Sequence, residues 1–79
     1  MKIKSLGRNV HELHLQNAII LFSYETPVAG WFESTGYWKT TEHYSKTTSK
    51  HINMWLKSKE AEKIGELAPS TIKNYIENI

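Results

Sequence analysis

The sequence has no cysteine and only two prolines and four glycines among its 79 residues. Without cysteine, neither a disulfide framework nor a thiolate metal site can form, which fits a reducing cytosol. The longest apolar run, Ala18 to Phe22, is far too short to span a bilayer. The N-terminal segment is basic but has no apolar run of signal-peptide length. We therefore expect a soluble, cytoplasmic protein with no membrane partner.

Strong charge is also lacking, because the net charge of +2 is weak support for nucleic-acid binding. Apolar residues make up a modest 39% of the chain, but three Trp, four Tyr and two Phe are present. A buried aromatic ring removes roughly 150–250 Å² from water. These rings make a compact core feasible, and the length predicts a single domain over 1–79.

The region 10–41 shows apolar segments separated by turn residues. The segments are 10–15, 18–24, 28–32 and 37–41. Pro27 lacks the N–H group that a central strand needs, and Gly36 suits a turn residue with positive φ. We predict a β-meander of three or four antiparallel strands here. Residues 1–9 are either frayed or pair at the edge of this sheet.

The hydrophobic period then changes to that of a helix. Ser45 is a good N-cap, and the predicted helix covers 45–57 with its cap. Its apolar stripe is formed by Thr48, Ile52, Trp55 and Leu56. Its basic stripe is formed by Lys46, Lys50, Asn53 and Lys57. Because so short a helix is marginal alone, the apolar stripe must pack on the sheet.

The segment 59–67 is ambiguous between strand and helix. AEKIGEL alternates well enough for a short strand with Ile64 in its middle, and a final helix over 69–79 follows. Ile72, Tyr75, Ile76 and Ile79 repeat in it at helical spacing. A helix-turn-helix is the alternative, but Gly65 would lie inside its first helix and Lys73 would be its recognition helix's one base. The predicted fold is α+β, with the 45–57 helix on one face of the sheet and the 69–79 helix covering part of the remainder.

The start of the 45–57 helix is a candidate anion site. Ser45, Thr47 and neighbouring backbone N–H groups could hold a phosphate or carboxylate, helped by Lys46 and Lys50. The ordinary alternative is that Ser45 caps the helix and the threonines pack or face water. No glycine-rich loop precedes the helix, so this is not a P-loop.

The basic stripe and the nearby aromatic residues are a candidate nucleic-acid surface. Lys46, Lys50 and Lys57, with His51, could follow a phosphate backbone while Trp31, Tyr37 or Trp38 stacks on bases. The ordinary alternative is a solvated helix face above a Trp and Tyr core.

The histidines do not predict a metal site. His11 and His14 lack the HExxH spacing and would point to opposite faces of a strand. We expect His51 to pack beside Trp55 or to bond a sheet carbonyl. No spacing of Ser, His and Glu enforces a catalytic site either. We expect no enzyme activity, no cofactor and no metal.

Two segments of the chain have distinctive patterns. Ser23 to Ala29 has the pattern Ser-Tyr-x-Thr-Pro-Val-Ala. Tyr44 to Leu56 has the pattern Tyr-Ser-x-Thr-Thr-Ser-Lys-His-Ile-Asn-x-Trp-Leu. Together they resemble a family of small proteins of unknown function encoded by bacteriophages and prophages. The resemblance covers roughly 18–57. It implies an accessory viral protein acting in the host bacterial cytoplasm, and it transfers no functional residue.

We expect a non-enzymatic binding protein that modulates or inhibits a host or defence-system protein by direct contact. Its working surface would combine the lysine stripe with Trp31 or Trp38, which flank the turn at 34–36, because Trp and Tyr are favoured in interface hot spots. The alternative is a nucleic-acid-binding module that uses the basic face of helix 45–57. A homodimer formed through an edge strand is also open.

Overall fold

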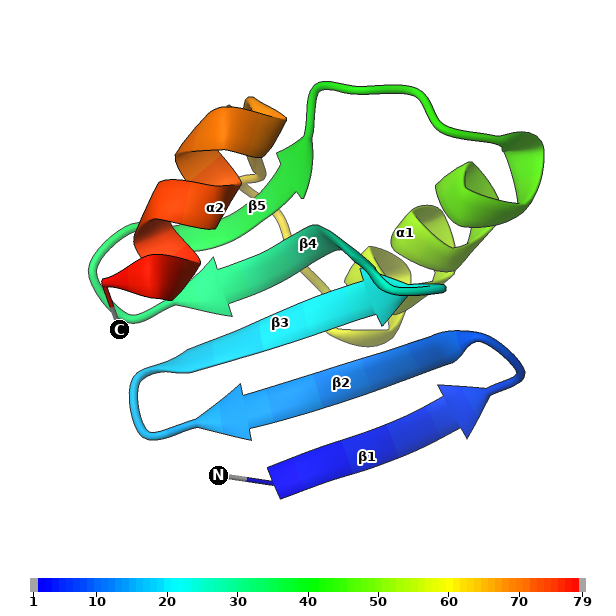
Figure 1. The fold of residues 1–79 in the computed structure, drawn as a ribbon, viewed down its shortest axis with the longest axis horizontal. Helices are drawn as coiled ribbons and strands as arrows, with labels where there is room; N and C mark the ends of the chain where they lie inside the picture. Colours follow the sequence, from blue (N-terminus) through cyan, green and yellow to red (C-terminus); the bar gives the residue numbers. More distant parts are fainter. Residues whose placement is uncertain (1, 79) are drawn as a thin grey trace.

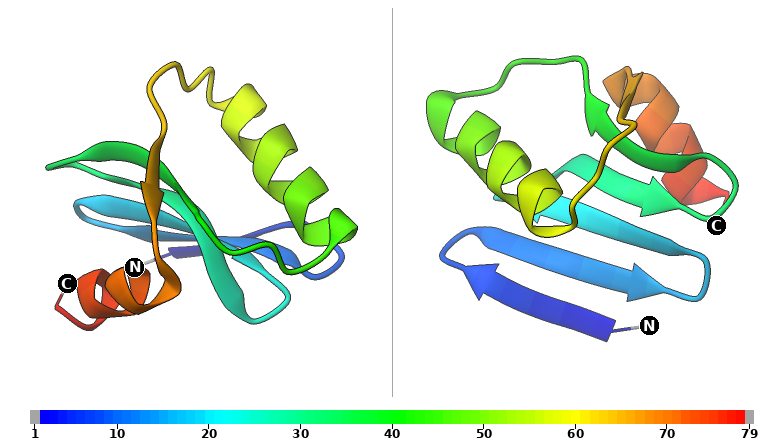
Figure 2. Two further views of the ribbon diagram at one scale, coloured as in Figure 1. Left: turned by 90° about the horizontal axis from the view of Figure 1, so that it is seen from above. Right: turned by 180° about the vertical axis from the view of Figure 1, so that it is seen from behind.

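The computed structural model describes residues 2–78 and contains one six-stranded sheet with a helix on each face (Figures 1 and 2). The strands follow chain order across the sheet, and all neighbours are antiparallel except the last pair. The elements are β1 (Lys2–Gly7), β2 (Val10–Leu15), β3 (Ala18–Ser23), β4 (Thr26–Phe32), β5 (Gly36–Thr40), α1 (Lys46–Ser58), β6 (Gly65–Leu67) and α2 (Pro69–Glu77). The α+β class is confirmed, but the sheet has six strands rather than three or four.

Strands β2 to β5 form the predicted antiparallel meander over 10–41. Gly36 has a φ of 86°, as its turn position requires. Pro27 does not separate the strands, as the sequence suggested, but lies within β4. It pairs with Phe22, and the next pair is Leu21 with Ala29, so Val28 is bulged out of register. A proline next to a bulge is tolerated because the hydrogen-bond ladder is already interrupted there.

The two outer strands, β1 and β6, lie in the two segments for which the sequence allowed alternative structures. Residues 2–7 pair with β2, so the edge-pairing alternative for 1–9 is confirmed over the described part. Gly65 to Leu67 pairs with β5, so the helix-turn-helix alternative is wrong. Ile64 precedes this strand and is exposed, rather than lying in its middle. Glycine at position 65 disfavours a helix, and Gly65 instead pairs with Trp38 as part of the sheet.

Helix α1 follows the predicted pattern. Ser45 is the N-cap, and its hydroxyl accepts a hydrogen bond from the Thr48 N–H at 3.1 Å. The four residues of the predicted apolar stripe are the buried ones, Thr48, Ile52, Trp55 and Leu56. We call the sheet face beneath them the α1 face. There they pack against Val10, Leu21, Val28 and Ala29.

Helix α2 covers part of the opposite sheet face, which we call the α2 face. Ile72 of this helix is buried with Ala18, Phe32 and Trp38. The Phe32 ring stacks on Trp38 at 5.2 Å and on Tyr75 at 4.9 Å between centroids. The helix begins at Pro69 as predicted, and the predicted member Ile79 lies outside the described residues. Neither described helix is long and apolar enough to cross a membrane.

Glycine at position 30 lets the Trp38 indole lie on the sheet. A Cβ atom there would stand 2.6 Å from the Trp38 ring and 2.5 Å from the Ile19 carbonyl oxygen. Because both contacts are far below van der Waals distance, any larger side chain would displace the indole or the β3 backbone. The close approach of Trp38 therefore depends on the absence of a side chain at Gly30.

Candidate binding surface

The predicted basic residues of α1 lie on its outer side. Lys46, Thr47, Lys50 and Lys57 are exposed. In the described part of the chain, none of these three lysines forms an ion pair. The basic stripe is therefore a continuous surface feature of α1.

The hydroxyl of Ser45 is engaged within the helix. Besides accepting from the Thr48 N–H, it donates a hydrogen bond to Thr48 Oγ1 at 3.2 Å. Thr48 Oγ1 in turn pairs with the buried Ser23 hydroxyl at 3.0 Å. The Ser45 hydroxyl therefore caps the start of α1 and stabilises the helix.

Of the two predicted tryptophans, Trp31 lies on the α1 face and Trp38 lies on the α2 face. Trp31 pairs with Tyr37 and Trp38 pairs with Gly30, so the two indoles lie on opposite faces of the sheet. Trp31 is half-buried, whereas Trp38 is 2% exposed. Phe32 and Ile72 pack against the Trp38 ring, so in this structure it offers almost no surface to a partner.

A buried carboxylate, which the sequence did not single out, connects the α1 face to its helix. Glu12 is 2% exposed, and it accepts hydrogen bonds from the Trp55 indole N–H and from Lys59 Nζ at 2.9 Å. His14 Nε2 lies 2.9 Å from the other carboxylate oxygen. Burial by itself raises the pKa of Glu12, but these hydrogen bonds and the Lys59 charge outweigh it and lower the pKa to about 2. Glu12 is therefore ionised and fully engaged inside the fold.

The histidines are dispersed. His11 and His14 point to opposite faces of β2, as predicted. His51 Nδ1 pairs with the Ser23 hydroxyl at 2.9 Å, rather than with a sheet carbonyl. His43 Nδ1 pairs with the Ser49 hydroxyl at 3.3 Å. Residues 2–78 hold no group of three or more His, Cys, Asp or Glu arranged for a metal ion.

The α2 face is only partly covered, because α2 crosses the end of the sheet at β4 and β5 (Figures 1 and 2). Over β1 to β3 the surface forms a hollow of about 390 Å³. Its apolar lining includes Ile3, Leu13, Phe22 and Tyr24. We call it the β1–β3 hollow. Ile3 and Tyr24 are 67% and 50% exposed, which is unusual for large apolar side chains grouped in so small a protein.

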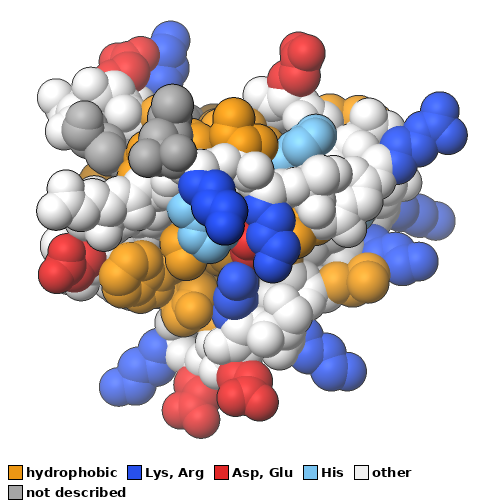
Figure 3. Space-filling model, turned by 90° about the horizontal axis from the view of Figure 1, so that it is seen from below, with side chains coloured by type: hydrophobic (Ala, Val, Ile, Leu, Met, Phe, Trp, Pro, Cys, Tyr) orange, Lys and Arg blue, Asp and Glu red, His pale blue; other side chains and the backbone are white. Residues whose placement is uncertain are grey.

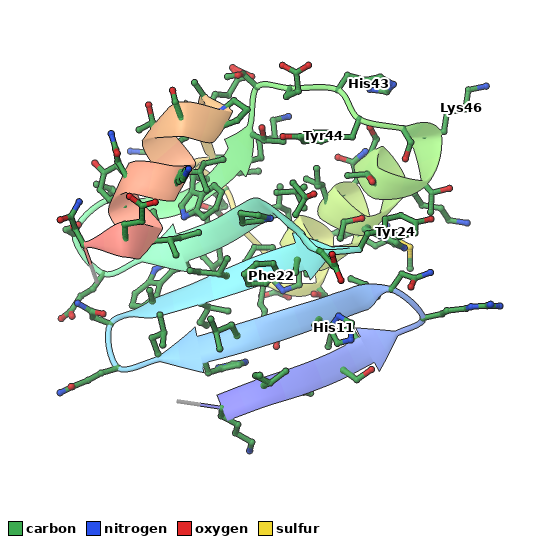
Figure 4. All side chains as sticks on the ribbon, in the orientation of Figure 1. His11, Phe22, Tyr24, His43, Tyr44 and Lys46 are labelled. Carbon is green, nitrogen blue, oxygen red and sulfur yellow. The ribbon has the colours of Figure 1, made fainter. Side chains whose placement is uncertain are left out.

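A second hollow, of about 370 Å³, lies between the sheet and α2, and we call it the α2 hollow. Phe22 lines both hollows and so separates them, while Tyr44 and Ile76 line the second. Figure 4 shows His11 beside Phe22 on the sheet, with Tyr24 at the end of β3 and Tyr44 toward α2. We call this surface the open face. It consists of Ile3, His11, Leu13, Phe22, Tyr24 and Tyr44.

The sequence interpretation missed the open face because 18–24 reads as one buried strand. Alternation within that strand separates Ile19, Leu21 and Ser23 from Ile20 and Phe22. The first three face α1, while Phe22 lies on the other face, beyond the cover of α2. This surface can therefore be identified only when the part of the sheet that α2 covers is known.

Residues 1–71 match a protein family of unknown function (DUF8033). The chain belongs to this family. The match includes all six strands and α1, whereas most of α2 lies beyond it. No curated protein and no solved structure matches the chain significantly.

Proposed function

We propose that this protein is a non-enzymatic binding module that acts by direct contact with another protein through its open face. The observation that carries the proposal is the grouping of Ile3, Phe22, Tyr24 and Tyr44 around two apolar hollows. Contiguous exposed apolar surface of this kind is typical of protein interfaces. This surface replaces the predicted one in which Trp38 took part.

The rings on the open face suit a protein partner. Tyr24 and Tyr44 are 50% and 44% exposed, and Tyr is enriched among the residues that dominate binding energy. The hollows on either side of Phe22 could accept apolar side chains of a partner. Such a contact would remove water from surface that the fold leaves exposed.

We further propose that the partner is a host or defence-system protein of a bacterium, which this protein modulates or inhibits in the cytoplasm. Support comes from the resemblance of Ser23–Ala29 and Tyr44–Leu56 to small phage-encoded proteins. Both segments contribute to the open face, through Tyr24 and Tyr44. The same residues that carry the resemblance therefore belong to the proposed contact surface.

A nucleic-acid-binding module is the second candidate, favoured by the basic stripe of α1. Lys46, Lys50 and Lys57 are exposed, and no ion pair neutralises them among the described residues. Phosphate contacts would make the affinity fall steeply with salt, with a log–log slope of about −0.7 to −0.9 per phosphate. An apolar protein contact would respond weakly to salt.

A pull-down of the tagged protein from bacterial lysate, with and without nuclease, separates the two candidates. We expect a stoichiometric protein partner that survives nuclease. Changing Lys46, Lys50 and Lys57 together to Glu should leave both the fold and this capture intact. Capture that disappears with nuclease, and also with the triple change, would contradict the protein-binding proposal and support the nucleic-acid module.

A further inference from the structure

Strand β1 forms one edge of the sheet and is exposed along its whole length. Residues 2–7 pair with β2 on one side, and β1 is the last strand of the sheet on the other. Its outward backbone N–H and C=O groups therefore form an unpaired edge within the described chain. Such an edge can accept a further strand by main-chain hydrogen bonding.

The two sides of β1 differ in chemistry. Lys2 pairs with His14 and Lys4 pairs with Glu12, which places both lysines on the side of the α1 face. Ile3 pairs with Leu13, on the side of the open face. Side chains of a strand added to β1 would alternate between these two environments.

The α1 side of this edge is basic. Lys59 and His14 lie beside Lys2 and Lys4, and Glu12 is the acidic group among them. Because Glu12 is buried and already bonded to Trp55, Lys59 and His14, it does not neutralise the outer lysines. Figure 3, seen from the β1 side, shows basic side chains gathered in the middle of this surface with a histidine beside them, and most acidic side chains at its margins.

The open-face side of the edge is apolar. Ile3 is 67% exposed and lines the β1–β3 hollow together with Leu13 and Phe22. An apolar side chain on an added strand would lie next to Ile3 and extend this hollow outward. The edge is thus continuous with the proposed contact surface.

A second copy of the chain would bring lysines together at this edge in two of the antiparallel registers. An antiparallel copy centred on Lys4 would set Lys4 against Lys4, and one centred on Ile3 would set Lys2 against Lys4. Like charges directly opposite each other on paired strands are destabilising. Lysines on edge strands also protect such edges from self-pairing, so the same charges disfavour a copy in these registers and favour an acidic partner.

On the basis of the proposed protein-binding function, we propose that β1 accepts an extended segment of the partner as a seventh strand. The acidic side chains of this segment lie toward Lys2 and Lys4, and its apolar side chains lie toward Ile3. Main-chain bonds along the edge supply affinity, and the alternation of acidic and apolar residues supplies specificity. The segment continues the sheet, and its apolar residues join the open face.

The test uses a short blocked peptide of alternating glutamate and valine, with a lysine–valine peptide as its charge-reversed counterpart. We expect the glutamate peptide to bind and to protect β1 amides from hydrogen exchange, and the lysine peptide not to bind. The Lys2→Gln/Lys4→Gln variant should bind about tenfold more weakly, which corresponds to the loss of cross-strand charge pairs. The matched Lys46→Gln/Lys50→Gln variant, with the same charge change on α1, should bind as the unchanged protein does.

Three results would overturn the proposal. One is equal binding by both variants, which would show that β1 charge does not select the peptide. Another is a chain that sediments as a dimer and protects the same β1 amides without peptide, which would place a second copy at the edge. The third is failure of the glutamate peptide to bind, while the unchanged protein and the Lys2→Gln/Lys4→Gln variant capture the same nuclease-resistant partner equally. This result would leave the protein-binding function supported but would exclude the addition of a strand to β1.

Discussion

Each face of the sheet buries an apolar cluster, but the two faces differ in how polar groups are used. On the α1 face, Glu12 and Ser23 are buried and bonded to side chains of α1 or the residue that follows it. On the α2 face, the contacts of α2 are apolar and aromatic, through Phe32, Trp38 and Ile72. Among residues 2–78, the buried Trp38 indole N–H on this face has no hydrogen-bond partner.

This difference assigns different tasks to the two faces. Directional bonds from Glu12 and Ser23 fix where α1 lies, because any displacement would leave buried polar groups unpaired. Apolar contacts are less directional, and α2 leaves the β1–β3 hollow open beside it. We infer that the α1 face is the structural side of the molecule and that the α2 face offers the binding surface.

The largest effect should come from removing Trp55. This side chain is 4% exposed in the α1 core and donates its indole N–H to Glu12. Trp55→Ala should destabilise the domain by about 3–5 kcal/mol, enough to unfold much of it. Thermal or urea unfolding measures this, with Met54→Ala, next to it and 60% exposed, as the control that should melt near the unchanged protein. A Trp55→Ala protein of unaltered stability would contradict the structural role of the α1 face.

The second effect is a loss of stability in acid that depends on Glu12. Its pKa in the folded protein is about 2, below the usual 4.5, so the folded state favours the ionised form. The stabilisation is complete above pH 4.5 and is lost as the pH falls from 4.5 toward 2. It corresponds to about 3 kcal/mol.

Urea unfolding between these pH values measures the loss. Glu12→Gln should lower stability at neutral pH and should remove this part of the pH dependence, since the amide does not titrate. Parallel pH profiles for the two proteins would show that Glu12 is not the group responsible.

A smaller effect tests the α2 face. Gly30→Ala should destabilise by about 1–3 kcal/mol, because its Cβ would overlap the Trp38 ring and the Ile19 carbonyl oxygen. Gly65→Ala is the matched control, since the nearest atom to a Cβ there is at 3.7 Å. Unfolding of the two variants side by side should show a loss at position 30 and little change at position 65. Equal stability of both would mean that the Trp38 packing tolerates displacement.

The sequence predicted the elements whose signals are local. The meander over 10–41 follows from alternation and turn residues, and α1 follows from Ser45 and a clear apolar stripe. Strand β6 was uncertain because Gly65 to Leu67 is short and its pairing with β5 is distant in sequence. The position of Pro27 was predicted wrongly because a bulge at Val28 lets the proline remain within a strand. No local sequence signal indicates that bulge.

The candidate surface was only partly predictable. Exposure of Lys46, Lys50 and Lys57 follows from the helical period, but the burial of Trp38 depends on where α2 packs. The open face depends on where α2 does not pack, which no local pattern of Ile3, Phe22 or Tyr24 reveals. The bonds of Glu12 join β2 to α1 and Lys59 across a large separation in the chain, so they too needed the tertiary structure.

Capture of a protein from nuclease-treated bacterial lysate by two matched double variants compares the faces most directly. Ile3→Ser/Tyr24→Ser changes two exposed apolar residues of the open face, and Met54→Ser/Ile64→Ser changes two exposed apolar residues elsewhere. Both should fold, because substitutions at exposed positions usually change stability by about 0.5 kcal/mol or less. We predict that the open-face variant loses the partner while the control variant retains it. Retention of the partner by the open-face variant would contradict the assignment of binding to the α2 face.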